Sequence, residues 1–379
     1  MSFNLGDDEH SPSIVIPKEW SAAADAIRDH SSSSSLQPVT IICGPKNSGK
    51  STFSRLLVNT LLEKYKKVGY LDTDVGQPEF TAPGLLSFIV VDKPTQDYTT
   101  PCIKNPERCL FYGDVSSKRD PIMYMNSVHS LYDYYRDQYC NNDNNEVFEN
   151  FEVPLVVNTP GWVKGVGYDI LVDMVRYIAP TYVVKINISS QNKNLPEGKF
   201  WLNDDRDINL SLIEINSALL DSFGRSLLIT KDASLRRDSK LMAYFRQCFD
   251  NYMEIGTIKE LARALAVHRP YQVECSVMKI NHIHCQIPAS ERFYSLNATI
   301  VGLAVSSHDS TSLPWCVGLG IVRCVDSAKG VLYVLTPVAP SILEHVDTIL
   351  QGFIQIPTCL LQVQGFVSPY MSTRVMPTG

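Results

Sequence analysis

Residues 39–52 read Val39-Thr40-Ile41-Ile42-Cys43-Gly44-Pro45-Lys46-Asn47-Ser48-Gly49-Lys50-Ser51-Thr52, an apolar run that leads directly into the pattern G-x-x-x-x-G-K-[ST]. Proteins that bind nucleoside triphosphates use this pattern as a phosphate-binding loop (P-loop). Gly44 and Gly49 allow positive φ angles, so that successive backbone N–H groups can point at a polyphosphate. Lys50 places a positive charge against the β- and γ-phosphates, and the hydroxyl of Ser51 can bind Mg²⁺. The loop predicts a triphosphate site formed by nine residues: Gly44, Pro45, Lys46, Asn47, Ser48, Gly49, Lys50, Ser51 and Thr52.

The sequence around the P-loop alternates between apolar runs and amphipathic stretches. Strands are predicted at residues 39–43, 68–71, 85–91, 155–158 and 182–188, and helices near residues 50–65, 122–137, 167–178 and 235–251. Near-continuous apolar strands separated by helices are typical of a parallel sheet that is buried on both faces. The predicted fold class is therefore α/β, with a P-loop NTPase parallel sheet and helices on both of its faces.

The chain of 379 residues is long enough for two domains. Residues 1–36 are predicted as a leader with a serine-rich link at Ser31–Ser35, and residues 37–266 as the P-loop domain with a lid helix. From residue 267 to 379 the pattern changes to short β-branched and aromatic runs at residues 272–280, 294–305, 315–325 and 331–335. This pattern predicts a smaller β-rich C-terminal domain.

Composition limits the classes of function. Hydrophobic residues make up 44% of the chain and charged residues 20%, and no apolar run or signal-like N-terminus indicates a membrane protein. Ten cysteines without C-x-x-C pairs indicate reduced thiols inside the cell. The net charge of −6 argues against binding nucleic acid through a general positive field, so a polynucleotide would need a local groove. Candidate basic clusters, each of which alone is more often a solvated surface charge, are Lys46, Lys118-Arg119, Arg236-Arg237-Lys240 and His268-Arg269.

A second, acidic motif follows the next predicted strand, in Leu71-Asp72-Thr73-Asp74-Val75-Gly76-Gln77. If the strand persists, Asp72 and Asp74 project to the same side at the carboxyl end of the sheet, where they would face the phosphates. One carboxylate could help to bind Mg²⁺, and the other could accept a proton from an attacking hydroxyl. The alternative is a turn in which both merely cap a helix. The chain lacks a guanine-reading N-K-x-D motif, which weakens a GTPase interpretation.

Two further segments are candidates for the same site. Thr159 and Trp162 follow the strand at residues 155–158, and Trp162 is either core packing or a platform on which a base could stack. Arg236 and Lys240 lie one helical turn apart, either on a lid that closes over the triphosphate or on an exposed amphipathic helix.

Together these motifs resemble the polynucleotide 5′-hydroxyl kinases of eukaryotes. That family has one branch in mRNA 3′-end formation and tRNA splicing, and a nucleolar branch in pre-rRNA processing. The resemblance to the family as a whole lies in Gly44–Thr52, Leu71–Gln77, Asn158–Val163 and the basic helix that ends at Ala243–Phe245. The chain resembles the nucleolar branch more closely, on Lys46-Asn47, Gln77–Thr81, Phe111–Asp114, Pro270–Val273 and Leu335–Pro340.

The resemblance implies an ATP-dependent kinase that phosphorylates RNA 5′-hydroxyl ends, located in the nucleus and nucleolus and assembled with an endoribonuclease. It implies that Lys50 and Ser51 hold phosphate and Mg²⁺ with Asp72, that Asp74 activates the 5′-hydroxyl, and that the lid carries Arg236 and Lys240. The implied substrate-binding residues are Gln77, Thr159, Gly161 and Trp162. The β-rich domain and the tail Tyr370–Gly379 would dock the nuclease. Alternatives are the other branch of the family, or a nucleotide-binding scaffold whose chemistry is dispensable.

The chain departs from the family pattern in two places. Family members usually carry a β-rich domain before the kinase domain, whereas about 36 residues precede the predicted sheet here. The lid pattern of the sister branch is Arg-x-x-x-Arg, whereas this chain has Arg236-x-x-x-Lys240. Lysine cannot make the two-pronged contact of arginine.

Overall fold

The computed structural model describes residues 16–30, 37–95, 102–140, 152–202, 210–218, 232–249, 255–306, 313–361 and Tyr370. The predicted serine-rich link at residues 31–35 and the tail at residues 371–379 lie outside the described residues. Within the described residues, no helix has both the length and the apolar character needed to cross a bilayer.

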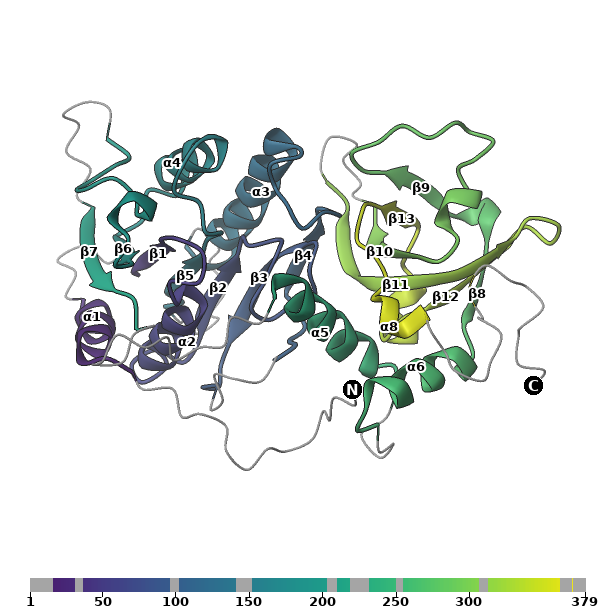
Figure 1. Cartoon of the computed structure of the whole chain (residues 1–379), viewed down its shortest axis with the longest axis horizontal. Coiled ribbons are helices and arrows are strands. Elements are labelled where there is room, and N and C mark those ends of the chain that lie inside the picture. The colour runs from purple at the N-terminus through teal and green to yellow at the C-terminus, as the bar shows by residue number, and fades with distance from the viewer. Residues whose placement is uncertain are drawn as a thin grey trace, which may run out of the picture.

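The first sheet contains seven strands in the order β4-β3-β2-β5-β1-β6-β7 (Figure 1). Five of them, β2, β5, β1, β6 and β7, run parallel; the sequence predicts the first four, whereas β7 lies outside the predicted strands. The strand β3 differs, because it is antiparallel to β2, and β4 is in turn antiparallel to β3. Residues 73–84 join β2 to β3 without a helix, and a parallel return needs a longer crossover. The bounds are β1 (Val39–Cys43), β2 (Val68–Asp72), β3 (Leu85–Val91), β4 (Arg108–Phe111), β5 (Leu155–Asn158), β6 (Tyr182–Asn187) and β7 (Ser211–Asn216).

Helices cover both faces of this sheet, which confirms the predicted architecture (Figure 1). On one face α1 (Lys18–Arg28) and α2 (Lys50–Leu61) pack on a cluster that contains Ile42. On the other face α3 (Pro121–Tyr139) and α4 (Val166–Ile178) pack on a cluster that contains Ile41. Because successive side chains of a strand point to opposite faces, these two adjacent isoleucines supply both cores.

The helix α1 is part of the folded core. Trp20 is only 1% exposed, packs edge-to-face on Phe53 with ring centroids 5.5 Å apart, and donates a hydrogen bond from Nε1 to the Asn216 carbonyl at 2.8 Å. A Cβ atom on Gly49 would lie 2.6 Å from Cη2 of Trp20. The indole therefore lies directly against the P-loop, and α1 joins α2 to the edge strand β7.

A second sheet occupies the C-terminal part, in the order β8-β12-β11-β10-β13-β9, with every pairing antiparallel except β13 with β9. Its strands are β8 (Tyr271–Glu274), β9 (Lys279–His282), β10 (Thr299–Val305), β11 (Trp315–Asp326), β12 (Val331–Leu335) and β13 (Thr348–Gln351). The remaining helices are α5 (Ala233–Arg246), α6 (Ile258–Val267), α7 (Pro340–Leu343) and α8 (Thr358–Leu361), with short 3₁₀ turns η1 (Gln191–Lys193), η2 (Cys275–Val277) and η3 (Tyr294–Leu296).

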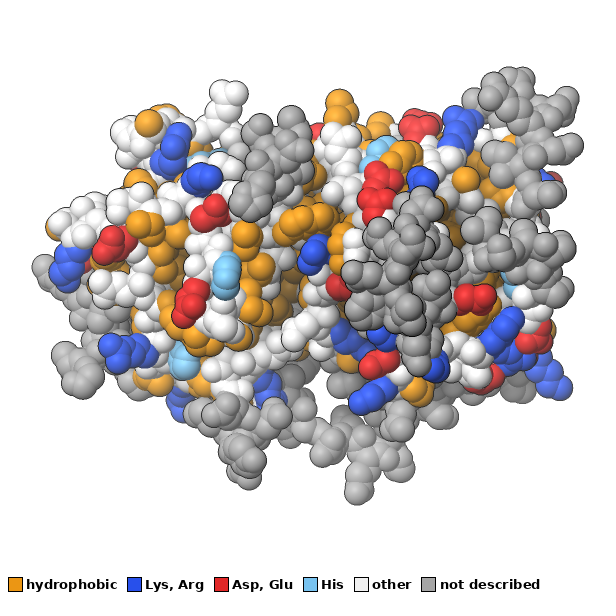
Figure 2. All heavy atoms as spheres, turned by 180° about the vertical axis from the view of Figure 1, so that it is seen from behind, with side chains coloured by type: hydrophobic (Ala, Val, Ile, Leu, Met, Phe, Trp, Pro, Cys, Tyr) orange, Lys and Arg blue, Asp and Glu red, His pale blue; other side chains and the backbone are white. Residues whose placement is uncertain are grey.

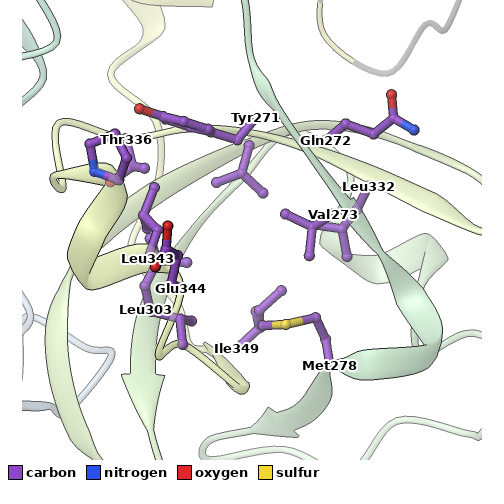
Figure 3. A pocket seen from close by; sticks show the side chains of 13 residues that line it. Tyr271, Gln272, Val273, Met278, Leu303, Leu332, Thr336, Leu343, Glu344 and Ile349 are labelled. Atoms are coloured by element: carbon purple, nitrogen blue, oxygen red, sulfur yellow. The ribbon is translucent and has the colours of Figure 1, made fainter.

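A cavity of about 320 Å³ opens within this second sheet, between β8, β12 and α7 (Figure 3). Leu303, Leu332 and Ile349 are among the apolar side chains that line it, together with Met278, whereas Glu344 is the acidic residue of the lining. The cavity belongs to the β-rich part of the chain, and the P-loop contributes nothing to its lining.

The two sheets share one hydrophobic cluster and meet in close backbone contact. Phe111 of β4 packs with Tyr244 of α5 and Leu319 of β11 in that cluster. The Phe353 amide donates a hydrogen bond to the Gly113 carbonyl at 2.6 Å, and a Cβ atom on Gly352 would lie 2.5 Å from Cα of Gly113. The proposed division at residue 266 stays a prediction, since the two halves bury a common core.

Gly352→Ala should destabilise the whole chain by about 1–3 kcal/mol, because the added methyl group meets backbone that cannot move aside cheaply. The midpoint of urea unfolding would measure the loss. Gly256→Ala is the matched control, since its nearest atom beyond the neighbouring residues, Glu260 Oε2, lies 3.8 Å away. Equal stability of the two variants would contradict the contact between residues 113 and 352.

Candidate active site

The P-loop adopts a cradle that depends on left-handed backbone. Gly44 and Gly49 have φ angles of 147° and 97°, and Asn47 between them has φ 59°. A Cβ atom on Gly44 would collide with the Ile186 carbonyl oxygen, so the loop lies tight against β6. The helix α2 starts at Lys50 without a side-chain cap, which leaves N–H groups of its first turn directed at the loop.

This cradle fits a polyphosphate. Uncapped N–H groups at a helix N-terminus together with the helix dipole favour an anion. The buried Oγ of Ser48 has no hydrogen-bond partner among the described residues, so the loop also holds a donor that a phosphate oxygen could satisfy. The residues predicted to bind the triphosphate are therefore brought together with the donors that such a ligand needs.

Lys50 is folded back onto the loop. Its Nζ donates to the carbonyl oxygens of Gly44 at 3.0 Å and Pro45 at 2.7 Å, and the side chain is buried. Burial lowers the pKa of Lys50 from 10.5 to about 8, while the negative charge of Asp74 acts in the opposite direction.

Asp72 is the last residue of β2, and its side chain is buried. Its Oδ1 accepts hydrogen bonds from the Asp74 amide at 3.2 Å and Asn158 Nδ2 at 3.1 Å, and its Oδ2 accepts from the Glu79 amide. Burial raises the pKa of Asp72 to about 7. Because three donors already occupy this carboxylate, it organises the loop at residues 73–80. Binding of Mg²⁺ by Asp72 stays a prediction. The three hydrogen bonds leave its carboxylate little capacity to accept a further ligand.

Asp74 lies beyond the end of the strand, so the two carboxylates do not project side by side as the sequence suggested. Its Oδ1 accepts from the amides of Gly76 and Gln77, both at 3.0 Å, in a local turn. For its second oxygen, Oδ2, no hydrogen bond is found among the described residues. Asp74 therefore caps a local turn, while its role toward a substrate hydroxyl stays a prediction.

The helix α5 brings Lys240 but not Arg236 to this loop. Nζ of Lys240 donates to the carbonyl oxygens of Pro78 and, at 2.8 Å, Glu79. Burial lowers the pKa of Lys240, and the charges of Glu79 and Asp72 oppose the shift. Arg236, one turn earlier, makes no contact with the site within the described part of the chain.

Of the predicted substrate-binding residues, some lie at the loops of the site and others are buried behind it. Gly161 abuts the P-loop, since a Cβ atom there would lie 2.6 Å from the Lys46 amide nitrogen, and Gln77 belongs to the Asp74 turn. Thr159 is fully buried and donates from Oγ1 to the Ile42 carbonyl at 2.7 Å. Its hydroxyl therefore holds β1 and β5 together.

Trp162 is only 7% exposed and belongs to the hydrophobic core, where it packs on Tyr124 with ring centroids 5.3 Å apart. Gly167 of α4 covers the ring, because a Cβ atom there would lie 2.7 Å from it. The sequence left two interpretations of Trp162 open, and the observed packing agrees with core packing. Stacking on a base would require the indole to leave that core.

Sequence reasoning missed three groups that shape the site. Arg55 of α2 forms a buried ion pair with Glu79 and so connects α2 to the acidic loop. Asn158 at the end of β5 holds Asp72, and Tyr124 donates from its hydroxyl to the Thr73 carbonyl at 2.6 Å. Only Asn158 had a local signal, as a polar residue that ends an apolar strand. Among the described residues, no cluster of three or more His, Cys, Asp or Glu could hold a metal ion.

Comparisons with known proteins agree with this geometry. Residues 44–247 match the family described as mRNA cleavage and polyadenylation factor CLP1 P-loop, and residues 266–357 match the family described as NOL9-like, C-terminal domain. The chain is 58% identical over 364 residues to the polynucleotide 5′-hydroxyl-kinase NOL9 of Arabidopsis thaliana, covering 95% of this chain and 96% of that protein. It is 31% identical to the polynucleotide 5′-hydroxyl-kinase NOL9 of Danio rerio, covering 89% of this chain but 49% of that protein.

A solved structure of a Clp1p–Pcf11p complex shares the fold, with a TM-score of 0.60 and 14% sequence identity, covering 88% of this chain and 77% of that one. The chain thus spans nearly the whole plant relative and about half of the zebrafish relative.

Lys50→Met should stabilise the free protein at pH 7, by about 1–3 kcal/mol, because it removes a buried charge. The folded-state pKa of about 8 lies below the ordinary 10.5, so above pH 8 the folded wild type loses a proton that the unfolded chain keeps. Wild-type stability therefore rises relative to the variant between pH 8 and 10.5. Thermal melts over this range would measure the difference.

Lys46→Met removes an exposed charge from the same loop and is the matched control. It should stabilise the protein much less at pH 7, because an exposed ammonium carries little desolvation cost. A gain for Lys50→Met that is the same at every pH would contradict a buried, charged lysine.

Proposed function

This chain belongs to the NOL9-like family of polynucleotide 5′-hydroxyl kinases, and we propose that it transfers the γ-phosphate of ATP to the 5′-hydroxyl end of RNA during pre-rRNA processing. The resemblance drawn from its motifs is thus confirmed at the level of the family. The observation that carries the proposed chemistry is the cradle of the P-loop, in which buried Lys50 lies at the uncapped N-terminus of α2 and Asp74 is held in the turn that follows β2. A cation for the phosphates and a carboxylate for the hydroxyl are the two groups that this transfer needs.

In the proposed reaction the P-loop amides and Lys50 hold the β- and γ-phosphates of ATP. The Lys50 ammonium exchanges its two carbonyl acceptors for phosphate oxygens, which relieves the cost of burying a charge without an anion. The substrate 5′-oxygen attacks the γ-phosphorus, and the bond to the bridging oxygen of ADP breaks. The hydroxyl proton passes to Oδ2 of Asp74, whose Oδ1 stays fixed by Gly76 and Gln77.

Ser51 would be a ligand of Mg²⁺ at this site, with Asp72 or Asp74 nearby, and the ion would neutralise charge on the phosphates. Lys240 lies at the same loop on the carbonyl groups of Pro78 and Glu79. This supports Lys240 as the lid cation and leaves Arg236 without a structural argument.

The cellular setting follows from the family. The match of residues 266–357 to the NOL9-like C-terminal domain favours the nucleolar branch over the mRNA and tRNA branch. We therefore propose a location in the nucleus and nucleolus. We also propose that an endoribonuclease, whose cut leaves the 5′-hydroxyl end, is a partner. The β-rich part of the chain, which carries no P-loop or paired acids, is the proposed docking surface for that nuclease.

Asp74→Asn should lower turnover of a short 5′-hydroxyl RNA by about 10²–10⁴-fold, the usual worth of a general base, and should leave ATP affinity unchanged. The amide oxygen of asparagine can still accept the Gly76 and Gln77 amides, so the turn should survive. Transfer of labelled γ-phosphate from ATP to the RNA would measure turnover, and Asp173→Asn on the exposed face of α4 is the matched control. Near-wild-type turnover would show that Asp74 is not the base. No transfer by the wild type would leave only a nucleotide-binding scaffold.

A further inference from the structure

Phe353 and Arg119 form a half-exposed aromatic–cation pair where the two sheets meet, and we call them the rim pair. Cζ of Arg119 lies 4.4 Å from the ring centroid of Phe353, which is 44% exposed. The Arg119 side chain is 50% exposed and pairs through Nε with the buried carboxylate of Asp114. His284 lies nearly parallel to Phe353, with an interplanar angle of 12° and ring centroids 6.3 Å apart, so it borders the ring without covering it fully.

The rim pair lies at the same edge of the first sheet as Asp74. Since β4 runs in the same direction as β2, the segment that follows β4, residues 112–120, emerges at the edge where Asp74 lies. A Cβ atom on Gly76 would lie 2.8 Å from the Val115 carbonyl oxygen and 3.4 Å from Oδ1 of Asp74. The loop that carries Arg119 therefore touches the turn that carries the candidate base.

The contacts that hold the two sheets together do not account for the exposed ring of Phe353. The junction is already closed by the contact of Gly113 with Gly352, by the hydrogen bond from the Phe353 amide, and by the shared hydrophobic cluster. His284 adds a further link, because its Nε2 donates to the Tyr112 carbonyl at 2.7 Å. Phe353 is not a member of that cluster, whereas Phe111 is, so the shared core does not use the Phe353 ring.

Aromatic rings near cations are what proteins use to hold single strands, because every base can stack on a ring whatever its sequence. The Arg119 charge is balanced by Asp114, so stacking rather than a positive field would supply most of the affinity. Lys118, exposed next to Arg119, adds one positive charge for a phosphate group. Figure 2 shows the molecule from behind the view of Figure 1, with acidic and basic side chains interspersed over the described residues. This mixture agrees with local binding of a nucleic acid and not with a general positive field.

We propose that Phe353, supported by Arg119, is a base-stacking site for the single-stranded nucleotides that follow the 5′ end of the polynucleotide substrate. A strand whose 5′-hydroxyl lies at Asp74 would pass over Gly76 and Val115 before it reaches Phe353. The second sheet thus contributes directly to substrate binding, and the rim pair contributes affinity only for substrates long enough to extend from Asp74 to Phe353. This inference rests on the proposed kinase function.

Phe353→Leu tests the proposal, because leucine keeps apolar contact at the junction and removes the ring. Its affinity for a fluorescent 5′-hydroxyl RNA decamer, measured by anisotropy without ATP, should fall about 5- to 150-fold, the worth of one stack. Its kcat/KM for a 5′-hydroxyl dinucleotide should equal that of the wild type. Phe353→Trp should bind the decamer at least as well as the wild type.

Tyr177→Leu is the matched control, since Tyr177 is 40% exposed in the last turn of α4, at the opposite edge of the sheet. It should change neither measurement. Unchanged decamer affinity in Phe353→Leu would overturn the stacking site, and so would equal losses on dinucleotide and decamer, which indicate a structural role. These results would leave the kinase function intact, whereas a wild type inactive on both substrates would remove the proposed function and this inference together.

Discussion

The carboxylate of Asp72, buried under the edge of the first sheet, is the interaction on which the rest of the site depends. It accepts hydrogen bonds from the Asp74 and Glu79 amides and from the Asn158 side chain. These bonds fix both ends of the loop at residues 73–80 and tie it to the neighbouring parallel strand. A buried carboxylate is stable only with such partners, so the loop and the strand end stabilise each other.

From that loop the constraint extends to distant elements. Glu79 forms a buried ion pair with Arg55 of α2, the helix that begins at the P-loop. Lys240 of α5 donates to the Pro78 and Glu79 carbonyls, while Tyr244 on the same helix accepts a hydrogen bond from the Leu319 amide of the second sheet at 2.7 Å. The helix α5 therefore connects the acidic loop to the β-rich part of the chain. A displacement of either part would move the position of the Lys240 ammonium.

The two aromatic residues considered for stacking show how far local sequence can be trusted. Trp162 follows a strand of the P-loop sheet, yet Tyr124 of α3 and Gly167 of α4 enclose it in the core. Phe353 lies at the far end of the chain, and nothing in its neighbourhood suggests a role in the site. Its position follows from the backbone contact of Gly352 with Gly113, which are 239 residues apart in a chain of 379 (352 minus 113).

The sequence alone determined the P-loop, four of the five parallel strands around it, the helices on both faces and the kinase family. Each of these depends on short-range rules: glycines that allow left-handed backbone, apolar periodicity and motif spacing. Tertiary structure alone decided the direction of β3, the separate duties of Asp72 and Asp74, the packing of Trp20 on Gly49, and which aromatic ring stays exposed. These features arise where elements far apart in the chain exclude water together, and burial of a side chain depends on all its neighbours rather than on the residues beside it in sequence.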